Sequence, residues 1–439
     1  MLIDTKRKFR SQTCNGLALG KSKCQYWANR HLRQAYQLHR NVNAYCFAHP
    51  RGLSKKPSMG DQNTGHQTYS HITANLRISY FLKPVHSTIS SPLTDGCITL
   101  NFVGNHIISV GQFDRLAADR VFEVADSMQP YAMRKNITRV LEGAILSNMF
   151  FEPSTRTRVS FGSAFNLLGG EVRETTEVKA SSLAKGESLY DTARVLSGYS
   201  DVIVMRHPES GSVAEFAQAS RVPVINGGDG PNEHPSQALL DLYTMRTEIA
   251  ASGQSIDGLK IALIGDLKFG RAVHSLCKLL CLYDNIQLNL ISPPELALPD
   301  DVLDLLRAAN HTINVFHDMA EGIQGVDILY VTRTQEERFP SQQEADKYKG
   351  LFRLNQAIYT QNCAPNTVIM HPLPRDSRAQ AQELDDDLNQ NPNLAIFRQT
   401  DNGMLIRMAL FALVLDVVDG VDNHARPVTW YTAKRHLPT

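Results

Sequence analysis

Residues 150–161 read FFEPSTRTRVSF and place two arginines and four hydroxyl side chains between aromatic residues. Residues 143–151 form an apolar run that predicts a buried strand, and residues 158–168 space their apolar side chains as on one helix face. The hydrogen-bond donors therefore lie where a strand turns into a helix N-terminus. Free backbone N–H groups and the helix dipole favour an anion at such a position. The stretch predicts a phosphate-binding site.

Helical spacing recurs on both sides of this stretch. For the helix at 158–168, the predicted inner face consists of Val159, Phe161, Ala164, Phe165 and Leu168. Upstream, a helix is predicted to begin near Ser109 or Asp114, with an inner face of Leu116, Val121, Phe122 and Val124. Downstream, a further helix is predicted to contain Leu189, Ala193, Val195 and Leu196.

Strands and helices alternate along the remainder of the chain. After 143–151, strands are predicted at 201–208, 222–227, 258–265, 286–293, 327–333 and 366–374, and helices include 235–251 and 299–309. Alternation with helices of this length is typical of parallel sheets and predicts an α/β fold. The series does not close into one eight-fold set. We therefore expect two parallel-sheet α/β domains joined by long helices.

The first hundred residues differ in charge from the rest. They hold 14 Lys and Arg against Asp4, Asp61 and Asp95, whereas the remainder holds 31 basic and 41 acidic residues. Such a segment resembles an organelle transit peptide, and Cys14, Cys24, Cys46 and His49 are candidate zinc ligands with weak spacing. Its composition favours a third interpretation, a disordered basic extension or a start assigned too far upstream. We expect a chain beginning near Asn101 to be fully active.

Composition also limits the compartment and the partners. No run approaches the roughly 20 apolar residues that span a bilayer, and no secretory leader is evident. Cys277, Cys281 and Cys363 form neither a disulfide framework nor a metal spacing, which suits a reducing cytoplasm. The basic extension lacks an ordered nucleic-acid-binding motif with interleaved aromatic residues. We expect a cytoplasmic protein that binds neither nucleic acid nor membrane.

Polar residues follow five of the predicted strands. In parallel α/β sheets, ligands bind outside the carboxyl ends of strands, so these residues should line one cleft. The groups are Ser154 to Thr157, Arg206 with His207, His234 with Gln237, Arg271, and Arg333 with Gln335. Any one arginine alone is more typical of a surface ion pair, and GDLKFGR lacks the GxGxxG pattern of nucleotide-binding loops. Together the groups predict a site for substrates with several negative charges.

These residues resemble the aspartate carbamoyltransferase family over about Asn105 to Leu415. The motifs that carry the resemblance are STRTR (154–158), SSLAKGES (181–188), MRHP (205–208), HPSQALLDL (234–242), GDLKFGR (265–271), TRTQEER (332–338) and HPLPR (371–375). STRTR alone indicates only the carbamoyltransferase superfamily. HPLP is the strongest discriminator, because ornithine enzymes usually carry HCLP. Two departures are mild: Ser236, where Thr is common, and Phe269, where some members have Tyr.

The resemblance implies the reaction and its domains. Carbamoyl transfer from carbamoyl phosphate to the α-amino group of L-aspartate would give N-carbamoyl-L-aspartate and phosphate, an early step of pyrimidine biosynthesis. It implies a carbamoyl-phosphate-binding domain at 101–237 plus 397–422, an aspartate-binding domain at 238–396, and a tail at 423–439. Neither a metal nor a cofactor is implied, because the amine of aspartate attacks directly.

The resemblance also assigns roles to individual residues. Ser154, Thr155, Arg156 and Thr157 would hold the phosphate, with Arg156 on the leaving oxygen. The carbonyl oxygen would be bound by Thr157, Arg206 and His234, and the carbamoyl NH₂ by Gln237 and the backbone of Leu373, beside Pro372 and Pro374. The aspartate carboxylates would be bound by Arg271 and Arg333, with Gln335. Ser181 and Lys185 would enter the site from the adjacent subunit, and Lys185 would also serve in aspartate binding and catalysis.

A homotrimer with shared active sites is therefore implied. The trimer could pair with a regulatory chain or with another enzyme of the pyrimidine pathway. Two alternatives remain open from the sequence: a carbamoyltransferase that uses ornithine or a modified ornithine as acceptor, and a non-catalytic homologue that acts as a scaffold. The HPLP and TRTQ segments argue against the first, and the intact phosphate and oxyanion residues argue against the second.

Overall fold

The computed structural model of the chain describes residues 100–176 and 186–433. Predictions for residues 1–99, including the candidate zinc ligands Cys14, Cys24, Cys46 and His49, lie outside these ranges. The predictions for Ser181 and Lys185 also lie outside them.

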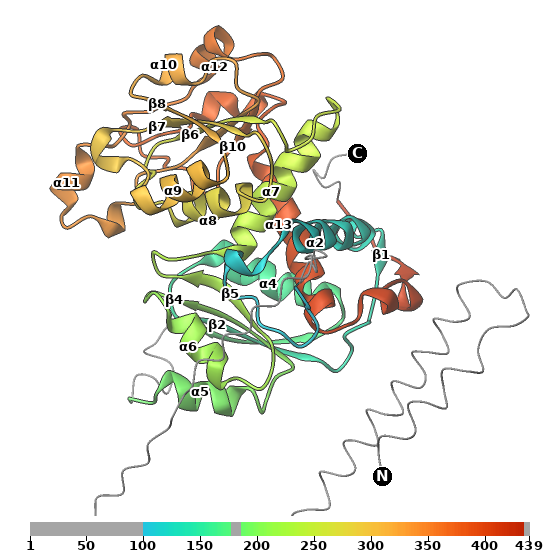
Figure 1. Cartoon of the computed structure of the whole chain (residues 1–439). Helices are drawn as coiled ribbons and strands as arrows, with labels where there is room; N and C mark the ends of the chain where they lie inside the picture. The colour runs from blue at the N-terminus through green and yellow to red at the C-terminus, as the bar shows by residue number, and fades with distance from the viewer. Residues whose placement is uncertain (1–99, 177–185, 434–439) are drawn as a thin grey trace, which may run out of the picture. The chain divides into compact units, whose positions relative to one another are not determined.

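Two parallel sheets dominate the described residues (Figure 1). The four-stranded sheet has the order β3 (Glu171–Thr176), β2 (Ile145–Phe150), β4 (Val202–His207) and β5 (Val224–Asp229). The five-stranded sheet has the order β10 (Val368–Met370), β9 (Ile328–Val331), β6 (Lys260–Ile264), β7 (Gln287–Ile291) and β8 (Thr312–Phe316). The predicted α/β fold with two parallel sheets is confirmed.

Helices cover both faces of the four-stranded sheet. They are α2 (Arg115–Ser127), α3 (Gln129–Ala132), α4 (Thr155–Leu167), α5 (Leu189–Leu196) and α6 (Ser212–Ala219). Successive residues of β4 point to opposite faces of the sheet. Val202 and Val204 belong to the same core cluster as Phe161 of α4, whereas Ile203 belongs to a cluster with Phe216 of α6. A strand buried on both faces in this way reads as a continuous apolar run.

The five-stranded sheet is also covered on both faces. Its helices are α7 (Pro235–Ala250), α8 (Arg271–Leu280), α9 (Asp300–Ala308), α10 (Met319–Gly322), α11 (Gln342–Asp346) and α12 (Gln356–Asn362). Leu263 shares a cluster with Leu276 of α8, and Ile264 shares another with Tyr359 of α12.

Two helices connect the two sheets. Helix α7 follows β5 and packs on α8, and α13 (Ile396–Val414) packs against α2, α4 and α7 and contacts β10. Most side chains of α13 are buried, including Arg407 and Asn402. The amide of Asn402 donates to Thr244 Oγ1 of α7 at 3.0 Å. A helix with apolar side chains on most of its sides must be packed against other elements on most sides. Elements beside both the four-stranded and the five-stranded sheet pack against α13.

Strand register brings the chemically active loops together. Phe150 of β2 lies opposite Arg206 of β4, and Ile264 of β6 lies opposite Val331 of β9. Because the strands are parallel, the loops that follow them leave at the same edge of each sheet. Within β2, the Asn148 side chain donates to the carbonyl of Arg158 at 3.1 Å and so holds the start of α4.

Some apolar positions differ from expectation. Leu116 and Val159, predicted to face inward, are 55% and 50% exposed. Helix α4 begins at Thr155, and Val159 lies about half a turn around it from the buried face that Phe161, Ala164 and Phe165 form. Asp114 caps α2 by accepting from Ala117 N, and Ser109 caps a separate short 3₁₀ helix, Val110–Gln112.

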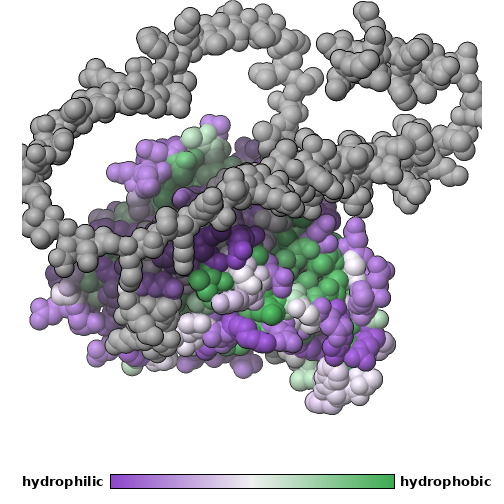
Figure 2. Space-filling view, turned by 90° about the horizontal axis from the view of Figure 1, so that it is seen from below, coloured by the Kyte–Doolittle hydropathy of each residue, from purple (hydrophilic) through white to green (hydrophobic). Residues whose placement is uncertain are grey.

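Helix α5 carries exposed apolar side chains. Tyr190, Val195 and Tyr199, at and just beyond this helix, are 57%, 46% and 68% exposed. Viewed from below Figure 1, the surface shows apolar areas between hydrophilic ones (Figure 2). In the part of the chain that the structure describes, no helix is long and apolar enough to cross a membrane.

The segment after α13 packs against the start of the described chain. There, β11 (Arg426–Pro427) pairs antiparallel with β1 (Asn136–Ile137). The buried Tyr131 donates its hydroxyl to Asp422 Oδ1 at 2.6 Å. The last described residues thus extend the half that contains α2 and α3.

Candidate active site

A cavity of about 710 Å³ opens where the loops from both sheets meet. Every described residue to which the family resemblance assigned a role lines it. These residues are Ser154, Thr155, Arg156, Thr157, Arg206, His234, Gln237, Arg271, Arg333, Gln335, Leu373 and Pro374. Their roles remain predictions, but the sequence reasoning selected residues that the fold brings to one place. His207 does not line the cavity; its ring packs edge-on against Phe151.

The first turn of α4 forms one end of the cavity. Ser154 is the N-cap residue, and its hydroxyl makes no capping hydrogen bond, so it does not occupy the amides of that turn. Partial burial and the nearby Arg333 lower the pKa of Arg156, which nevertheless stays a cation at neutral pH. Hydroxyls, backbone amides and a guanidinium at a helix N-terminus form a site for a phosphate group.

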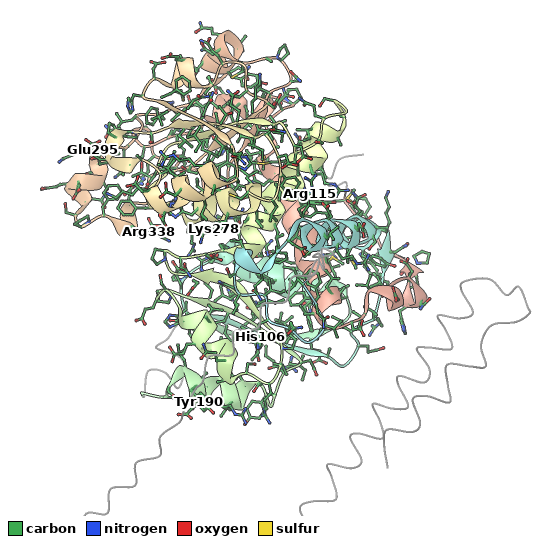
Figure 3. All side chains as sticks on the ribbon, viewed as in Figure 1. His106, Arg115, Tyr190, Lys278, Glu295 and Arg338 are labelled. Atoms are coloured by element: carbon green, nitrogen blue, oxygen red, sulfur yellow. The ribbon has the colours of Figure 1, made fainter. Side chains whose placement is uncertain are left out.

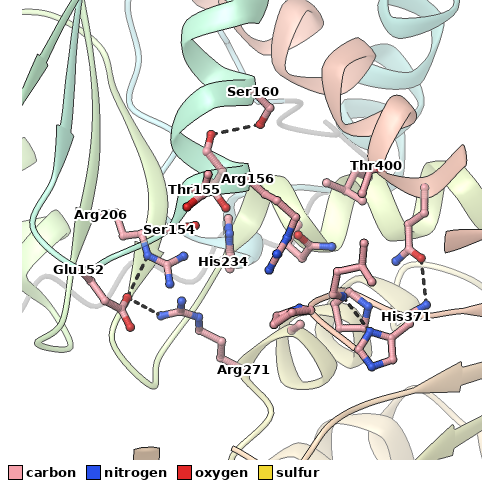
Figure 4. A pocket seen from close by; sticks show the side chains of 18 of the residues that line it. Glu152, Ser154, Thr155, Arg156, Ser160, Arg206, His234, Arg271, His371 and Thr400 are labelled. Carbon is pink, nitrogen blue, oxygen red and sulfur yellow. Dashed lines mark hydrogen bonds and ion pairs between the residues drawn. The ribbon is translucent and has the colours of Figure 1, made fainter. Parts of the chain in front are cut away.

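Glu152 lies between two arginines at the edge of this site (Figure 4). Its Oε2 is 3.0 Å from Arg206 Nε and 3.3 Å from Arg271 Nη1. Burial and the adjacent Arg271 lower the pKa of Arg206 to about 10, so it remains charged. Arg206 and Arg271 are only 10% and 11% exposed, and they offer concentrated positive charge that one carboxylate only partly balances.

His234 occupies the N-cap position of α7 within the same wall. It is buried, and its backbone N–H donates to Ser275 Oγ at 3.2 Å. Burial, followed by repulsion from Arg271 and Arg206, holds the pKa of His234 well below its ordinary value. The imidazole is therefore neutral at physiological pH and carries one N–H that can be donated to a ligand.

The segment after β9 supplies the opposite wall. Arg333 donates two hydrogen bonds to its neighbour Glu337, of 3.0 and 2.6 Å. Gln335 is held by its backbone N–H, which donates to Asp266 Oδ2 at 3.0 Å. Arg338, labelled in Figure 3, donates to the carbonyl of Gly230 at 3.1 Å. This wall is thus rich in cations that already hold carboxylate or carbonyl oxygens.

The HPLP loop closes the cavity on the side of α13. His371 is buried, with Nε2 at 2.8 Å from Glu383 Oε1 and Nδ1 accepting from Leu373 N at 2.8 Å. Its own backbone N–H donates to Gln399 Oε1 of α13 at 3.0 Å. Leu373 has φ of 58°, a conformation that costs a non-glycine residue free energy and that this network maintains.

Sequence reasoning missed several cavity residues: Glu152, Arg338, Gln399 and Arg407. Glu152 lies two residues before Ser154, and a carboxylate so close to several hydrogen-bond donors could have indicated it as a site residue. Gln399 and Arg407 lie inside a buried helix, where no turn or strand end draws attention to them. Arg407 stacks over Phe161, with 4.9 Å between its Cζ and the ring centroid.

The described residues contain no group of three or more His, Cys, Asp or Glu side chains arranged to hold a metal ion. The chemistry available at this site consists of cations, hydroxyls, amides and a neutral imidazole around a cavity. Such a set can bind a polyanion and stabilise negative charge that develops on an oxygen.

Two family profiles match this chain in succession. Residues 105–247 match "Aspartate/ornithine carbamoyltransferase, carbamoyl-P binding domain", and residues 257–414 match "Aspartate/ornithine carbamoyltransferase, Asp/Orn binding domain". The chain belongs to the aspartate/ornithine carbamoyltransferase family.

Individual relatives agree with this assignment. The aspartate carbamoyltransferase catalytic subunit of Saccharophagus degradans is 71% identical over 335 residues, which cover 76% of this chain and 99% of that protein. Its counterpart in Methanocaldococcus jannaschii is 42% identical over 315 residues, which cover 72% and 99%.

Solved structures agree as well. Aspartate transcarbamoylase from Trypanosoma cruzi in complex with carbamoyl phosphate and aspartate is 38% identical, with a TM-score of 0.66 over 72% of this chain and 98% of that one. The same enzyme in complex with N-(phosphonacetyl)-L-aspartic acid gives a TM-score of 0.64 at 38% identity over 72% and 96%.

Proposed function

We propose that this chain is an aspartate carbamoyltransferase. It transfers the carbamoyl group of carbamoyl phosphate to the α-amino group of L-aspartate and so acts early in pyrimidine biosynthesis. One observation carries the proposal: a single cavity combines a helix N-terminus bearing Ser154 to Thr157 with Arg206, His234, Arg271 and Arg333. Relatives that carry this activity by name, and structures with both substrates bound, support it.

The phosphate of the donor binds at the start of α4. Ser154, Thr155 and Thr157 donate hydroxyl hydrogen bonds, and Arg156 binds the oxygen that bridges carbon and phosphorus. As the C–O bond breaks, negative charge grows on that oxygen, and a fixed guanidinium stabilises the charge in the transition state.

The carbonyl oxygen of the donor binds between Thr157, Arg206 and His234. Attack on the carbonyl carbon converts this oxygen into an oxyanion, which donors placed in advance stabilise more strongly than they stabilise the ground state. A neutral His234 serves as a donor through its N–H and adds no repulsion to the arginines. The carbamoyl NH₂ is held by Gln237 and the backbone beside Leu373 and Pro374.

Aspartate binds on the other side, where its two carboxylates meet Arg271 and Arg333, with Gln335 beside the latter. Both arginines now hold protein carboxylates, Glu152 and Glu337. A guanidinium that donates hydrogen bonds to a protein carboxylate can instead donate them to a carboxylate of the substrate. Two parallel hydrogen bonds would then fix the orientation of that carboxylate.

The amine of aspartate is the nucleophile. A C–N bond forms, the C–O bond to phosphate breaks, and the amine proton passes to the departing phosphate. The reaction is balanced without a covalent enzyme intermediate, a metal or a cofactor. The protein contributes positioning and charge stabilisation.

A homotrimer with shared active sites completes this proposal. Thr155, Arg156 and the apolar Val159 are exposed at the phosphate end, which is where Ser181 and Lys185 of an adjacent subunit would enter. Mixing inactive Lys185→Ala and Arg156→Ala chains should restore activity, since some sites would then hold both intact residues. Full activity in a monomer would contradict the shared site. The further partner that we propose for the trimer is a regulatory chain or another enzyme of the pyrimidine pathway.

The proposed domains follow from the two sheets. Residues 101–237 with 397–422 would bind carbamoyl phosphate, residues 238–396 would bind aspartate, and 423–439 would form a tail. The proposed compartment is the cytoplasm, which suits the free thiols of Cys277, Cys281 and Cys363.

The deciding experiment offers the purified chain carbamoyl phosphate with L-aspartate or with L-ornithine. We expect N-carbamoyl-L-aspartate and no citrulline. Citrulline would keep the phosphate site and overturn the aspartate assignment. No product with either acceptor would point to a non-catalytic homologue.

A further inference from the structure

Asp241 is a fully buried carboxyl one helical turn beyond Gln237 on α7. The Gln237 side chain donates from Nε2 to Asp241 Oδ1 at 2.8 Å. Gln237 lines the cavity, whereas Asp241 does not. The carboxyl therefore acts on the site only through its neighbours.

Two further donors converge on the same carboxyl. Gln399 of α13 donates from Nε2 to Oδ1 at 2.6 Å, and Tyr330 of β9 donates its hydroxyl to Oδ2 at 2.6 Å. The Oε1 of Gln399 in turn accepts the backbone N–H of His371, at the start of the HPLP loop. Asp241 thus connects Gln237 to the loop that carries Leu373.

The shared Oδ1 sets which end of the Gln237 amide faces the ligand. An amide offers an oxygen that accepts and a nitrogen that donates, on opposite sides of one carbon. Rotating the Gln237 amide would place Oε1 against Oδ1, two acceptors in contact without a proton between them. With Nε2 bound to Asp241, Oε1 is on the other side of the amide and is the one acceptor that this side chain can offer to a ligand.

This orientation does not depend on the charge of Asp241. Burial raises the pKa of Asp241 to about 7, although its three hydrogen bonds oppose that effect. When Asp241 is protonated, the proton can sit on Oδ2, where Tyr330 can turn to accept it. Oδ1 stays an acceptor for both glutamine amides in either form.

We propose that Asp241 is a positioning residue that makes the site select a carbamoyl donor, by holding Gln237 with its oxygen toward the NH₂ of that donor. The inference rests on the proposed function and deepens it. A carbamoyl NH₂ can donate to Gln237 Oε1, whereas the methyl group of acetyl phosphate, an otherwise similar anion, cannot. A site built around such a hydrogen bond rejects the analogue that lacks it.

The test compares the KM for carbamoyl phosphate with the inhibition constant of acetyl phosphate, with aspartate saturating. In Asp241→Leu, which removes the acceptor at similar volume, we expect preference for carbamoyl over acetyl phosphate to fall by about tenfold or more. Asp241→Asn can keep Oδ1 as an acceptor and donate from Nδ2 to Tyr330, so it should retain the preference. Tyr330→Phe, which removes only the bond to Oδ2, is the matched structural control and should also retain it.

A double-mutant comparison separates positioning from general damage. If Asp241 acts through Gln237, then Gln237→Leu should lose the preference by itself, and adding Asp241→Leu should reduce it little further. Circular dichroism and the melting temperature identify variants that fail to fold, and the Gln237→Leu result stands even if Asp241→Leu fails to fold.

The outcomes distinguish this inference from the proposed function. A wild-type chain that makes no carbamoyl-aspartate contradicts the function. If the wild type is active but Asp241→Leu or Gln237→Leu keeps the preference for carbamoyl over acetyl phosphate, only the role of Asp241 is overturned. Loss of preference in Tyr330→Phe equal to that in Asp241→Leu would likewise overturn it, because it would indicate loosened packing.

Discussion

Glu152 Oε2 lies 3.3 Å from Arg271 Nη1, although 119 residues separate the two in the chain. Glu152 follows β2 of the four-stranded sheet, and Arg271 begins α8 beside the five-stranded sheet. The same carboxylate also contacts Arg206, at 3.0 Å. One acidic side chain thus joins the proposed donor-binding and aspartate-binding sides, and it holds the guanidinium that a substrate carboxylate would need.

Arg271→Ala should raise the KM for aspartate by a hundredfold or more, of the order expected when a buried charged pair loses one partner. The KM for carbamoyl phosphate should change by less than about threefold, because Arg271 is assigned to the second substrate. Initial-rate kinetics with each substrate varied in turn would measure both constants. Equal losses for both substrates would count against the assignment.

Arg156→Ala should lower kcat by about 10²- to 10³-fold. This is the usual effect of removing one hydrogen-bond donor that stabilises the negative charge developing in the transition state. Arg156→Lys keeps the charge but loses the planar fork, so we expect an intermediate rate. Product formation under saturating substrates is the measurement. A variant that raises only KM would place Arg156 in ground-state binding instead.

His234 should make the protein sensitive to acid. Its pKa in the folded state is held well below 6.5, chiefly by burial, while in the unfolded chain it should lie near 6.5. Below that pH the unfolded chain binds a proton that the folded chain does not, so the contribution of His234 to stability is complete above pH 6.5 and decreases as the pH falls. Urea unfolding of wild type and His234→Gln between pH 5 and 8 should give curves that converge toward low pH; parallel curves would contradict this.

Tyr131→Phe should destabilise the protein by about 1 kcal/mol, the usual net value of one hydrogen bond. The change removes the hydroxyl that donates to Asp422 at 2.6 Å and leaves the buried ring in place. Urea denaturation would measure it, with activity as the control, because neither residue lines the cavity. A loss above about 3 kcal/mol would mean that the C-terminal segment detaches as a whole.

A chain beginning at Asn101 should retain full activity and the same oligomeric state. All the described site residues lie after this position, as do both family matches. Specific activity and size-exclusion elution of the full and shortened chains would test this. Loss of folding or activity on shortening would assign a role to residues 1–100.

The sequence predicted elements whose apolar pattern was strong. Strands β2 and β4 were anticipated because they are buried on both faces. The edge strand β3, with the sequence EVRETT, was missed, since it has few apolar residues and was not distinguished from the adjoining loop. Helix α13 has apolar residues on most sides, so it lacks the one-sided periodicity by which a helix is recognised.

Site residues close to the ends of strands were predictable from the sequence, and those farther from strand ends were less so. Arg206 lies at the carboxyl end of β4, and Ser154 to Thr157 and Arg271 lie beyond the ends of β2 and β6, so the rule for parallel sheets selects them. Asp241, Gln399 and Arg407 act from within helices, and only tertiary packing places them together. From the sequence alone, Asp241 cannot be distinguished from the other polar residues of its helix.

The position of α13 has a consequence for synthesis. Residues 396–414 complete the core around α2 and α4, yet the ribosome makes them after the whole five-stranded sheet. The part of the chain translated earlier must therefore wait with an apolar surface uncovered until nearly the last residues emerge. During translation, the half that begins first becomes complete last, and chaperones would be needed most at that stage.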